Sequence, residues 1–229
     1  MKWRSLEEST PGADDRPLCE IFAERKELIS QYVPQEIQSV HEQAITELRD
    51  QGISKRALAV GAKAPSFELK DHNGRTVSSA EILKTDRLVI CFFRGRWCPF
   101  CVGQLEGMNR ILPQIRAAGA GLVAISPQTV QQSFFMADQH RLGFPLLSDA
   151  GNQVARRFGL VYHVPEYQQS IYRRTFVNLP FINGEDSWEL PIPAVYVVDR
   201  DNSVRFAAVN PDYKERPEPE EILCQLARP

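Results

Sequence analysis

Two cysteines separated by two residues are the clearest candidates for chemistry in this sequence. They lie in the segment WCPFC, residues 97–101, which follows a continuous apolar run over residues 88–93 and precedes a stretch with helical spacing of apolar residues. In the first turn of a helix, this spacing brings the sulfurs of Cys98 and Cys101 within reach of a disulfide. Pro99 suits that turn, where its missing N–H is not needed. The pattern predicts a redox-active pair.

The predicted place of the pair favours the reactive form of a thiol. Unpaired N–H groups and the positive end of the helix dipole lie at a helix N-terminus. Both stabilise a thiolate, which is the form that attacks. Arg94 and Arg96 add positive charge if their side chains face the sulfurs, and Trp97 is expected to pack beside them.

Other uses of the cysteines are less consistent with their spacing. A structural zinc site needs four ligands, whereas the remaining cysteines are isolated and the four histidines form no spaced pair. We therefore predict no metal and no other cofactor. Cys91, inside its apolar run, is expected to be an inert core residue. Cys19 and Cys224 are possible distant resolving thiols, which the adjacent pair makes unnecessary.

The composition excludes several classes of protein. The chain has 229 residues, 43% of them apolar and 24% charged, which is ordinary for a globular protein. A net charge of -2 offers no basic field for nucleic acid. An apolar run of six residues is far too short to span a membrane. The first residues, with Trp3, Arg4, Glu7 and Glu8, lack the pattern of a secretory signal. A sparse, odd set of cysteines then favours the reducing cytoplasm.

The first 56 residues are expected to form helices. Pro17, after Asp14 and Asp15, suits a first helical turn, and Pro34 should end that helix and open a second. Gly52 is a plausible stop. The apolar stripes of these helices fit a helical hairpin packed on the main domain or a contact in a dimer, and we favour the packed hairpin.

Strands and helices alternate in the rest of the chain. Asp71-His72-Asn73-Gly74 is a strong turn signal for a small hairpin. Residues 162–191 have no clear period and are expected to be an insertion near the site. The alternation predicts an α/β fold with a central sheet flanked by helices. We expect strands at 88–93, 122–125, 144–147, 194–198 and 204–209, and helices at 101–118, 130–141, 154–158 and 219–227.

Several segments resemble one known family. The stretch from Leu88 through Cys101 is similar to the catalytic strand and loop of the peroxiredoxin group, the alkyl hydroperoxide reductase and thiol-specific antioxidant family, and the resemblance covers roughly residues 60–226. WCPFC, the segment 187–191 and Asp212-Tyr213 resemble a peroxiredoxin-like branch with a thioredoxin-style CxxC. The opening segment resembles the family at Gly61, Ala64, Pro65, Phe67, Leu69, Asp71 and Gly74.

The resemblance implies a fold and an activity. It implies a thioredoxin-like fold with a central mixed sheet over residues 57–229, preceded by the helical extension 1–56. It also implies hydroperoxide reduction by a cysteine thiolate, turnover by thioredoxin or a similar dithiol, and a possible homodimer. Nucleic acid and membrane are not expected as partners.

Two family templates disagree about the attacking sulfur. The peroxiredoxin loop aligns its peroxidatic cysteine with Cys101 and its threonine with Cys98. Thioredoxin instead makes Cys98 the exposed attacker and Cys101 the buried resolver. The choice stays open at the level of the sequence.

The sequence also departs from the peroxiredoxin pattern. Arg94 replaces the proline that opens the motif, and the later arginine that polarises the peroxide has no counterpart just before Ala194. That place holds Ile192-Pro193, which looks like the thioredoxin Ile-cis-Pro turn that faces the disulfide. Arg216 is a candidate for the missing cation, although we expect an ordinary surface arginine there.

Three functions follow, in order of preference. The first is a thiol peroxidase that cycles Cys98 and Cys101 between dithiol and disulfide. The second is a protein disulfide reductase, in which Pro193 shapes a docking groove. The third is a binding module whose CxxC is incidental. His163 is a candidate proton donor, but an isolated loop histidine is more often solvated.

Overall fold

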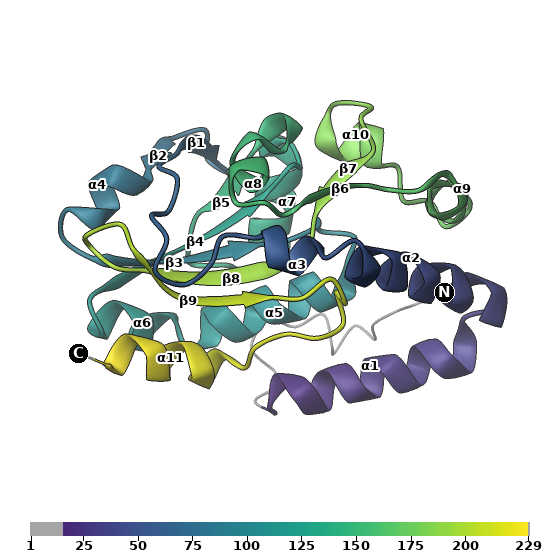
Figure 1. Ribbon diagram of the computed structural model, residues 1–229, viewed down its shortest axis with the longest axis horizontal. Coiled ribbons are helices and arrows are strands. Elements are labelled where there is room, and N and C mark those ends of the chain that lie inside the picture. Colours follow the sequence, from purple (N-terminus) through teal and green to yellow (C-terminus); the bar gives the residue numbers. More distant parts are fainter. Residues whose placement is uncertain (1–15, 229) are drawn as a thin grey trace.

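A seven-stranded mixed sheet forms the centre of the molecule (Figure 1). The computed structural model describes residues 16–228, so the features noted above at residues 3–15 lie outside the described residues. β3, β4 and β5 are parallel, whereas β8 runs antiparallel to β3, and β1 antiparallel to β5. In sheet order, the strands are β2 (Thr76–Ser78), β1 (Glu68–Asp71), β5 (Leu146–Ser148), β4 (Ala120–Ser126), β3 (Arg87–Phe92), β8 (Ala194–Val198) and β9 (Val204–Val209).

Helices cover the sheet on both faces. A second, two-stranded sheet pairs β6 (Val161–His163) with β7 (Glu189–Pro191). The helices are α1 (Leu18–Tyr32), α2 (Gln35–Asp50), α3 (Ile53–Arg56), α4 (Ser79–Leu83), α5 (Pro99–Arg110), α6 (Leu112–Ala117), α7 (Val130–Gln139), α8 (Gln153–Arg157), α9 (Glu166–Arg174), α10 (Leu179–Asn183) and α11 (Pro219–Ala227), with a short 3₁₀ helix over Ala150–Asn152. The predicted α/β class with helices flanking a mixed sheet is confirmed.

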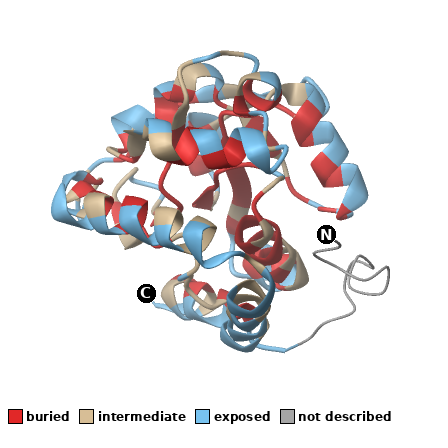
Figure 2. Ribbon diagram, turned by 90° about the vertical axis from the view of Figure 1, so that its right-hand side faces the viewer, coloured by how far each residue is buried: buried red, intermediate tan, exposed pale blue. Residues whose placement is uncertain are grey.

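Alternation along β3 divides the core between the two faces. Successive side chains of a strand point to opposite faces, so Val89 and Cys91 pack with α5, α6 and α11. Ile90 and Phe92 pack on the other face, with residues of α4 and α8. Figure 2 shows buried strands at the centre and exposed residues on the outer sides of the helices. The loop that follows β3 therefore leaves the sheet between two covered faces.

The N-terminal helices pack on the same core. Pro34 separates α1 from α2, as predicted. Leu18 and Phe22 of α1 are buried in the cluster that contains α5. The Glu218 carboxylate accepts hydrogen bonds from the first amides of α1, those of Leu18 and Cys19, at 2.9 and 2.6 Å. The packed hairpin is confirmed for the described residues, while the division into domains at residues 56 and 57 stays a prediction.

Two expectations differ in detail from the structure. The single helix predicted over residues 101–118 is two helices, α5 and α6, which meet at Ile111. Pro113 lies in the first turn of α6, and its ring and missing N–H prevent an unbroken helix through that point. The aperiodic segment 162–191 holds β6, α9, α10 and β7. No helix among residues 16–228 is long and apolar enough to cross a membrane.

Candidate active site

The CxxC segment begins α5 at the end of the buried strand β3. Gly95 has a φ of 145°, and a Cβ there would lie 2.6 Å from Trp97 Nε1, so only glycine fits this turn. Cys98 is the residue before the first helical position, and its carbonyl accepts the first helical hydrogen bond, from Val102, at 3.0 Å. Pro99 occupies the first turn, as predicted. Both sulfurs therefore lie at the N-terminus of α5.

Cys101 is surrounded by groups that stabilise a thiolate. Its thiol is free and its side chain is completely buried. Burial alone would raise the pKa of Cys101, but a hydrogen bond from Cys98, the charges of Arg216 and Arg94, and the Arg94 amide lower it to about 5. Arg216 Nη2 lies 3.3 Å from the Cys101 sulfur. The negative charge of the pair is held on Cys101.

Cys98 has the opposite character. Its side chain is 1% exposed, and burial together with its hydrogen bond to Cys101 raises the pKa of its thiol. Cys98 therefore keeps its proton and donates it toward the Cys101 sulfur. The thioredoxin template, with an exposed and ionised first cysteine, does not match this arrangement, whereas the peroxiredoxin alignment on Cys101 does.

Arg94 lies buried in an aromatic enclosure. Its guanidinium is 4.6 Å from the ring centre of Trp97 and 4.1 Å from that of Tyr213, distances at which a cation is attracted to the ring face. It donates a hydrogen bond to the Tyr172 hydroxyl, and Nη1 lies 4.0 Å from the Cys98 sulfur. The condition stated for Arg94, that its side chain face the sulfurs, is therefore fulfilled.

Arg216 joins the site from the segment between β9 and α11. The expectation of an ordinary surface arginine is wrong, because its guanidinium contacts Cys101 and also donates to Gln104 Oε1 at 2.7 Å. Gln104, one turn after Cys101 on α5, is 1% exposed. Gln104 and Arg216 line a groove of about 360 Å³, whose opposite wall includes Ala194, Val195 and Ala208. The Arg216 side chain therefore lines the groove and also contacts the Cys101 sulfur.

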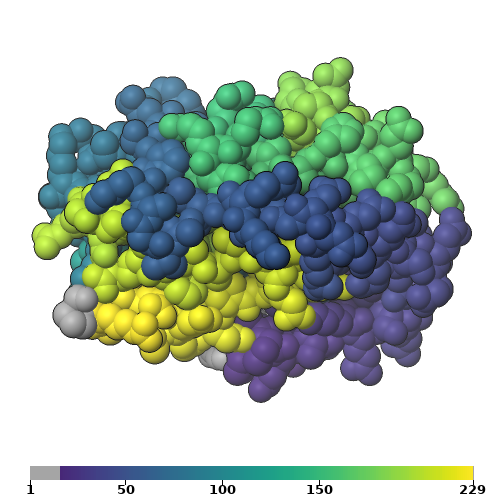
Figure 3. Space-filling model, in the orientation of Figure 1, coloured from purple at the N-terminus to yellow at the C-terminus, as the bar shows by residue number. Residues whose placement is uncertain are grey.

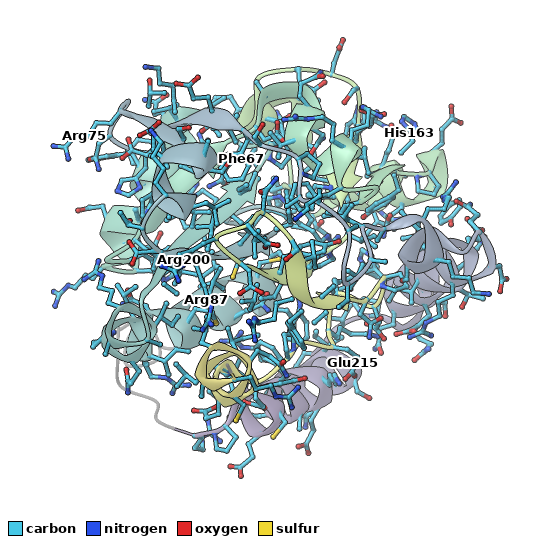
Figure 4. The ribbon with its side chains drawn as sticks, turned by 60° about the vertical axis from the view of Figure 1, so that its left-hand side comes forward. Phe67, Arg75, Arg87, His163, Arg200 and Glu215 are labelled. Carbon is cyan, nitrogen blue, oxygen red and sulfur yellow. The ribbon has the colours of Figure 1, made fainter. Side chains whose placement is uncertain are left out.

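Other predicted site residues are placed differently. Arg96 turns away from the sulfurs, because its guanidinium donates to Gln132 on α7 at 3.2 Å. Pro193 lines the groove, but the expected cis bond is wrong, since residues 16–228 contain no cis peptide. The Ile192 amide instead donates to the Leu160 carbonyl, which holds this segment extended between β7 and β8. His163 is exposed and takes no part in the site (Figure 4).

The N-terminal helices cover the pair from the other side. Arg25 donates to the Pro99 carbonyl at 2.5 Å, and the Phe22 ring packs edge-on against Phe100 at 5.2 Å. His41 of α2 lies against Tyr172 and Tyr213. In Figure 3, the C-terminal segment lies directly against α1. Figure 4 places Glu215, next to Arg216, beside these helices, where it pairs with Lys26.

Sequence reasoning missed most of the residues that surround the sulfurs. Gln104 is hidden among the apolar positions of α5, and Tyr172 lies in the segment without a period. Tyr213 was noted only within the Asp212-Tyr213 motif. The Asp212-Tyr213 motif, which lies far from the CxxC in the sequence, is the one signal that could have predicted a role for the C-terminal segment in the site. No group of three or more metal-ligating side chains gathers anywhere in the described part of the chain.

Comparisons with known proteins identify the family and the fold. A family model described as AhpC/TSA family matches residues 60–207. Peroxiredoxin Q, chloroplastic, of Triticum aestivum is 32% identical over 109 residues, which are 48% of this chain and 50% of that protein. Peroxiredoxin Bcp of Escherichia coli is 29% identical over 103 residues, 45% of this chain and 65% of that protein. The chain thus spans between half and two thirds of the length of these relatives.

Solved structures share the fold. The crystal structure of peroxidoxin BcpB from Mycobacterium tuberculosis superposes with a TM-score of 0.58 at 21% identity, over 74% of this chain and 96% of that one. A structure of a PrxQ mutant from Xylella fastidiosa superposes with a TM-score of 0.59 at 15% identity, over 74% of this chain and 95% of that one. The thioredoxin-like fold expected from the resemblance is confirmed.

Proposed function

We propose that this chain, which belongs to the AhpC/TSA family, is a thiol peroxidase that reduces hydrogen peroxide or organic hydroperoxides through Cys101 and Cys98. One observation carries the proposal. The Cys101 sulfur accepts a hydrogen bond from the Cys98 thiol and lies 3.3 Å from a guanidinium. A thiolate held beside a cation and a proton donor has what the cleavage of an O–O bond requires.

The first step forms an S–O bond and breaks the O–O bond. The Cys101 thiolate attacks one peroxide oxygen and becomes a sulfenic acid, while the other oxygen leaves with the electron pair. The leaving oxygen takes the proton of Cys98 and departs as alcohol or water. Arg216, which lines the groove and contacts the sulfur, stabilises the negative charge that develops on that oxygen. Arg216 thus supplies the cation that is missing before Ala194.

The second step closes the disulfide. The Cys98 thiolate attacks the sulfenic sulfur and expels hydroxide, which leaves as water after taking a proton from solvent. An external dithiol, thioredoxin or a similar protein, then reduces the disulfide by exchange. The nature of this dithiol, a homodimer and a cytoplasmic location stay predictions.

The runner-up function, reduction of protein disulfides, requires a different attacker. Cys98 would have to be the ionised sulfur of the pair. Burial and its hydrogen bond to Cys101 instead raise the pKa of the Cys98 thiol, whereas the pKa of Cys101 is lowered. The placing of the negative charge on Cys101 therefore favours the peroxidase.

Stopped-flow oxidation of the reduced protein tests the proposal. We expect hydrogen peroxide and an organic hydroperoxide to convert the protein rapidly to one intramolecular disulfide. Cys101→Ser should abolish sulfenic acid formation, because the nucleophile is lost. Cys98→Ser should leave a sulfenic acid that dimedone traps, because the resolving thiol is lost.

The matched control is the double variant Cys19→Ser with Cys224→Ser, which removes the two exposed thiols and should leave both steps unchanged. Slow oxidation of the wild type together with fast reduction of insulin would replace the peroxidase with the disulfide reductase. A trappable sulfenic acid in Cys101→Ser would move the attack to Cys98.

A further inference from the structure

Arg94 is a buried cation without an acidic partner. Its side chain is 2% exposed, and among residues 16–228 it forms no ion pair with a carboxylate. Its contacts are the hydroxyls of Tyr172 and Tyr162, the rings of Trp97 and Tyr213, and the Cys98 sulfur. Only the sulfur pair offers a negative charge, and a buried charge is costly unless it is compensated.

Arg216 is a second cation that lies beside the sulfur pair and has neutral hydrogen-bond acceptors. Its hydrogen bonds go to the Tyr213 carbonyl at 2.9 Å, Gln104 Oε1 at 2.7 Å and the Cys101 sulfur at 3.3 Å. The first two acceptors are neutral. Within the described part of the chain, Arg216 also forms no ion pair with a carboxylate. Two guanidinium groups thus share one source of negative charge, the Cys101 thiolate.

The two redox states of the pair differ in this charge. In the dithiol state, the thiolate compensates part of the positive charge of Arg94 and Arg216. In the disulfide state, neither sulfur carries a charge, and both cations remain. An environment that stabilises the thiolate stabilises the reduced form of a dithiol, which makes its disulfide a strong oxidant.

We propose that the Cys98–Cys101 disulfide is destabilised by these two guanidinium groups and oxidises external dithiols far more readily than the disulfide of thioredoxin does. In the step, two electrons and two protons leave the external dithiol, which becomes a disulfide. Cys98 takes one proton, Cys101 leaves as the thiolate, and the second proton goes to solvent. Even weakly reducing thiols can then drive turnover. The inference rests on the dithiol–disulfide cycle of the proposed function.

Equilibration with thioredoxin, without any peroxide, measures this property directly. Full-length protein is mixed with reduced or oxidised thioredoxin, approached from both directions, quenched in acid and alkylated for mass analysis. We expect an equilibrium constant more than tenfold in favour of the reduced protein, which corresponds to more than about 29.6 mV. A tenfold preference or less would overturn the proposal. Because no peroxide is present, failure of the peroxidase would not affect this result.

A pair of arginine variants separates the charge from general effects of substitution. Arg216→Gln removes the half-buried cation that contacts Cys101 and should shift the equilibrium at least tenfold toward the disulfide. Arg96→Gln removes a guanidinium from the same loop, but one that contacts Gln132. This control should shift the constant less than threefold. Equal shifts in both variants would contradict the proposal.

The pH dependence gives a second measure that needs no variant. If Cys101 is already ionised, reduction takes up one proton for two electrons, and the potential falls by about 29.6 mV per pH unit between pH 6 and 8. If both thiols are protonated, the slope doubles. A slope twice as steep would show that Cys101 is protonated in the reduced protein, and it would refute the proposal that its thiolate compensates the two guanidinium groups.

Other titratable groups near the pair keep their charge over this range. Burial raises the pKa of the neighbouring tyrosines, which stay neutral, and lowers the pKa of His41 to about 4. The charged groups on the surrounding elements are Arg25 on α1, Asp212 with its partners Arg49 and Lys214, Glu215 with Lys26, and Glu221 in the groove.

Discussion

At the scale of single residues, the reactivity of Cys101 depends on side chains that other residues position. Arg216 is 115 residues away in the sequence, and its guanidinium reaches the sulfur while bonded to Gln104. Gln104 does not touch the reacting atoms, so it is a positioning residue. Its amide oxygen fixes one end of the guanidinium fork and leaves the other end for the thiolate.

Gln104→Leu tests this positioning role. The variant keeps the volume but removes the acceptor, so Arg216 loses its fixed place beside Cys101. Because a cation near a thiol favours the ionised form, its displacement should raise the pKa of Cys101 by about one unit from its value of about 5. The pH profile of alkylation of the reduced protein by iodoacetamide measures the midpoint.

The control is Gln132→Leu, a buried glutamine that accepts a hydrogen bond from Arg96. Both variants lose a buried acceptor of an arginine, and only the first should move the midpoint. An unchanged midpoint in Gln104→Leu would refute the role of Gln104.

The reactive pair could be predicted from the sequence, but its surroundings could not. The spacing of Cys98 and Cys101 and the position of Pro99 are local signals with a local physical meaning. Whether Arg94, Arg96 or Arg216 faces the sulfurs depends on side-chain direction and on contacts between distant segments. Sequence spacing carries no information on either, so the directions of Arg94 and Arg96 stayed open and Arg216 was expected at the surface.

At the scale of elements, α1 closes the site against solvent. Phe22 is 3% exposed and packs on Phe100, between the two cysteines. The helix also places Arg25 on the Pro99 carbonyl. These contacts cover the CxxC segment on the side of α1.

Phe22→Ala should open this cover. Deletion of a buried ring leaves a cavity and costs about 3–5 kcal/mol in the free energy of unfolding, which urea denaturation measures. Maleimide should then modify Cys98 and Cys101 several times faster in the folded protein. Tyr32→Ala, at the exposed end of the same helix, should change stability by less than about 0.5 kcal/mol. Equal modification rates in wild type and Phe22→Ala would show that α1 is not the barrier.

Elements with strong patterns were predicted well. The prolines at 17 and 34 mark where α1 and α2 begin, and α11 covers the predicted residues 219–227. The segment 162–191 gave no pattern, because its elements are short and α9 buries Gln168 and Gln169 beside its apolar residues. A helix that buries amides has no apolar stripe for sequence analysis to detect.

At the scale of the whole molecule, one close backbone contact joins the N-terminal helices to the rest. Gly159 follows α8 with a φ of 72°, and a Cβ there would lie 2.4 Å from the Arg56 carbonyl oxygen. The neighbouring amide of Leu58 donates to the Phe158 carbonyl at 3.0 Å. This contact fixes the chain where the predicted extension meets the predicted domain.

Gly159→Ala should therefore destabilise the entire molecule. The left-handed conformation alone costs a non-glycine residue about 1–2 kcal/mol, and the clash with backbone adds about 1–3 kcal/mol. Gly74→Ala is the matched control, since its φ is 77° and nothing lies within 4 Å of the added Cβ. Thermal unfolding should show a larger loss for Gly159→Ala. Equal losses would mean that the backbone contact relaxes freely.

The class of the fold could be predicted from the alternation of strands and helices. The closure of the site could not, because α1, α9 and the segment around Arg216 converge on it from three separate parts of the chain. The apolar residues of these segments predict that the segments are buried, but they do not predict which other part of the chain each one packs against.

The bond from the Glu218 carboxylate to the first amides of α1 has a consequence for biosynthesis. A ribosome releases the cysteines long before it has made residues 216–218. Until then the nascent polypeptide lacks Arg216, one of the two cations beside the cysteines, and the Glu218 carboxylate that binds the first amides of α1. Cys101 therefore gains the guanidinium of Arg216 only after the C-terminal segment has been made and has folded against α5 and α1.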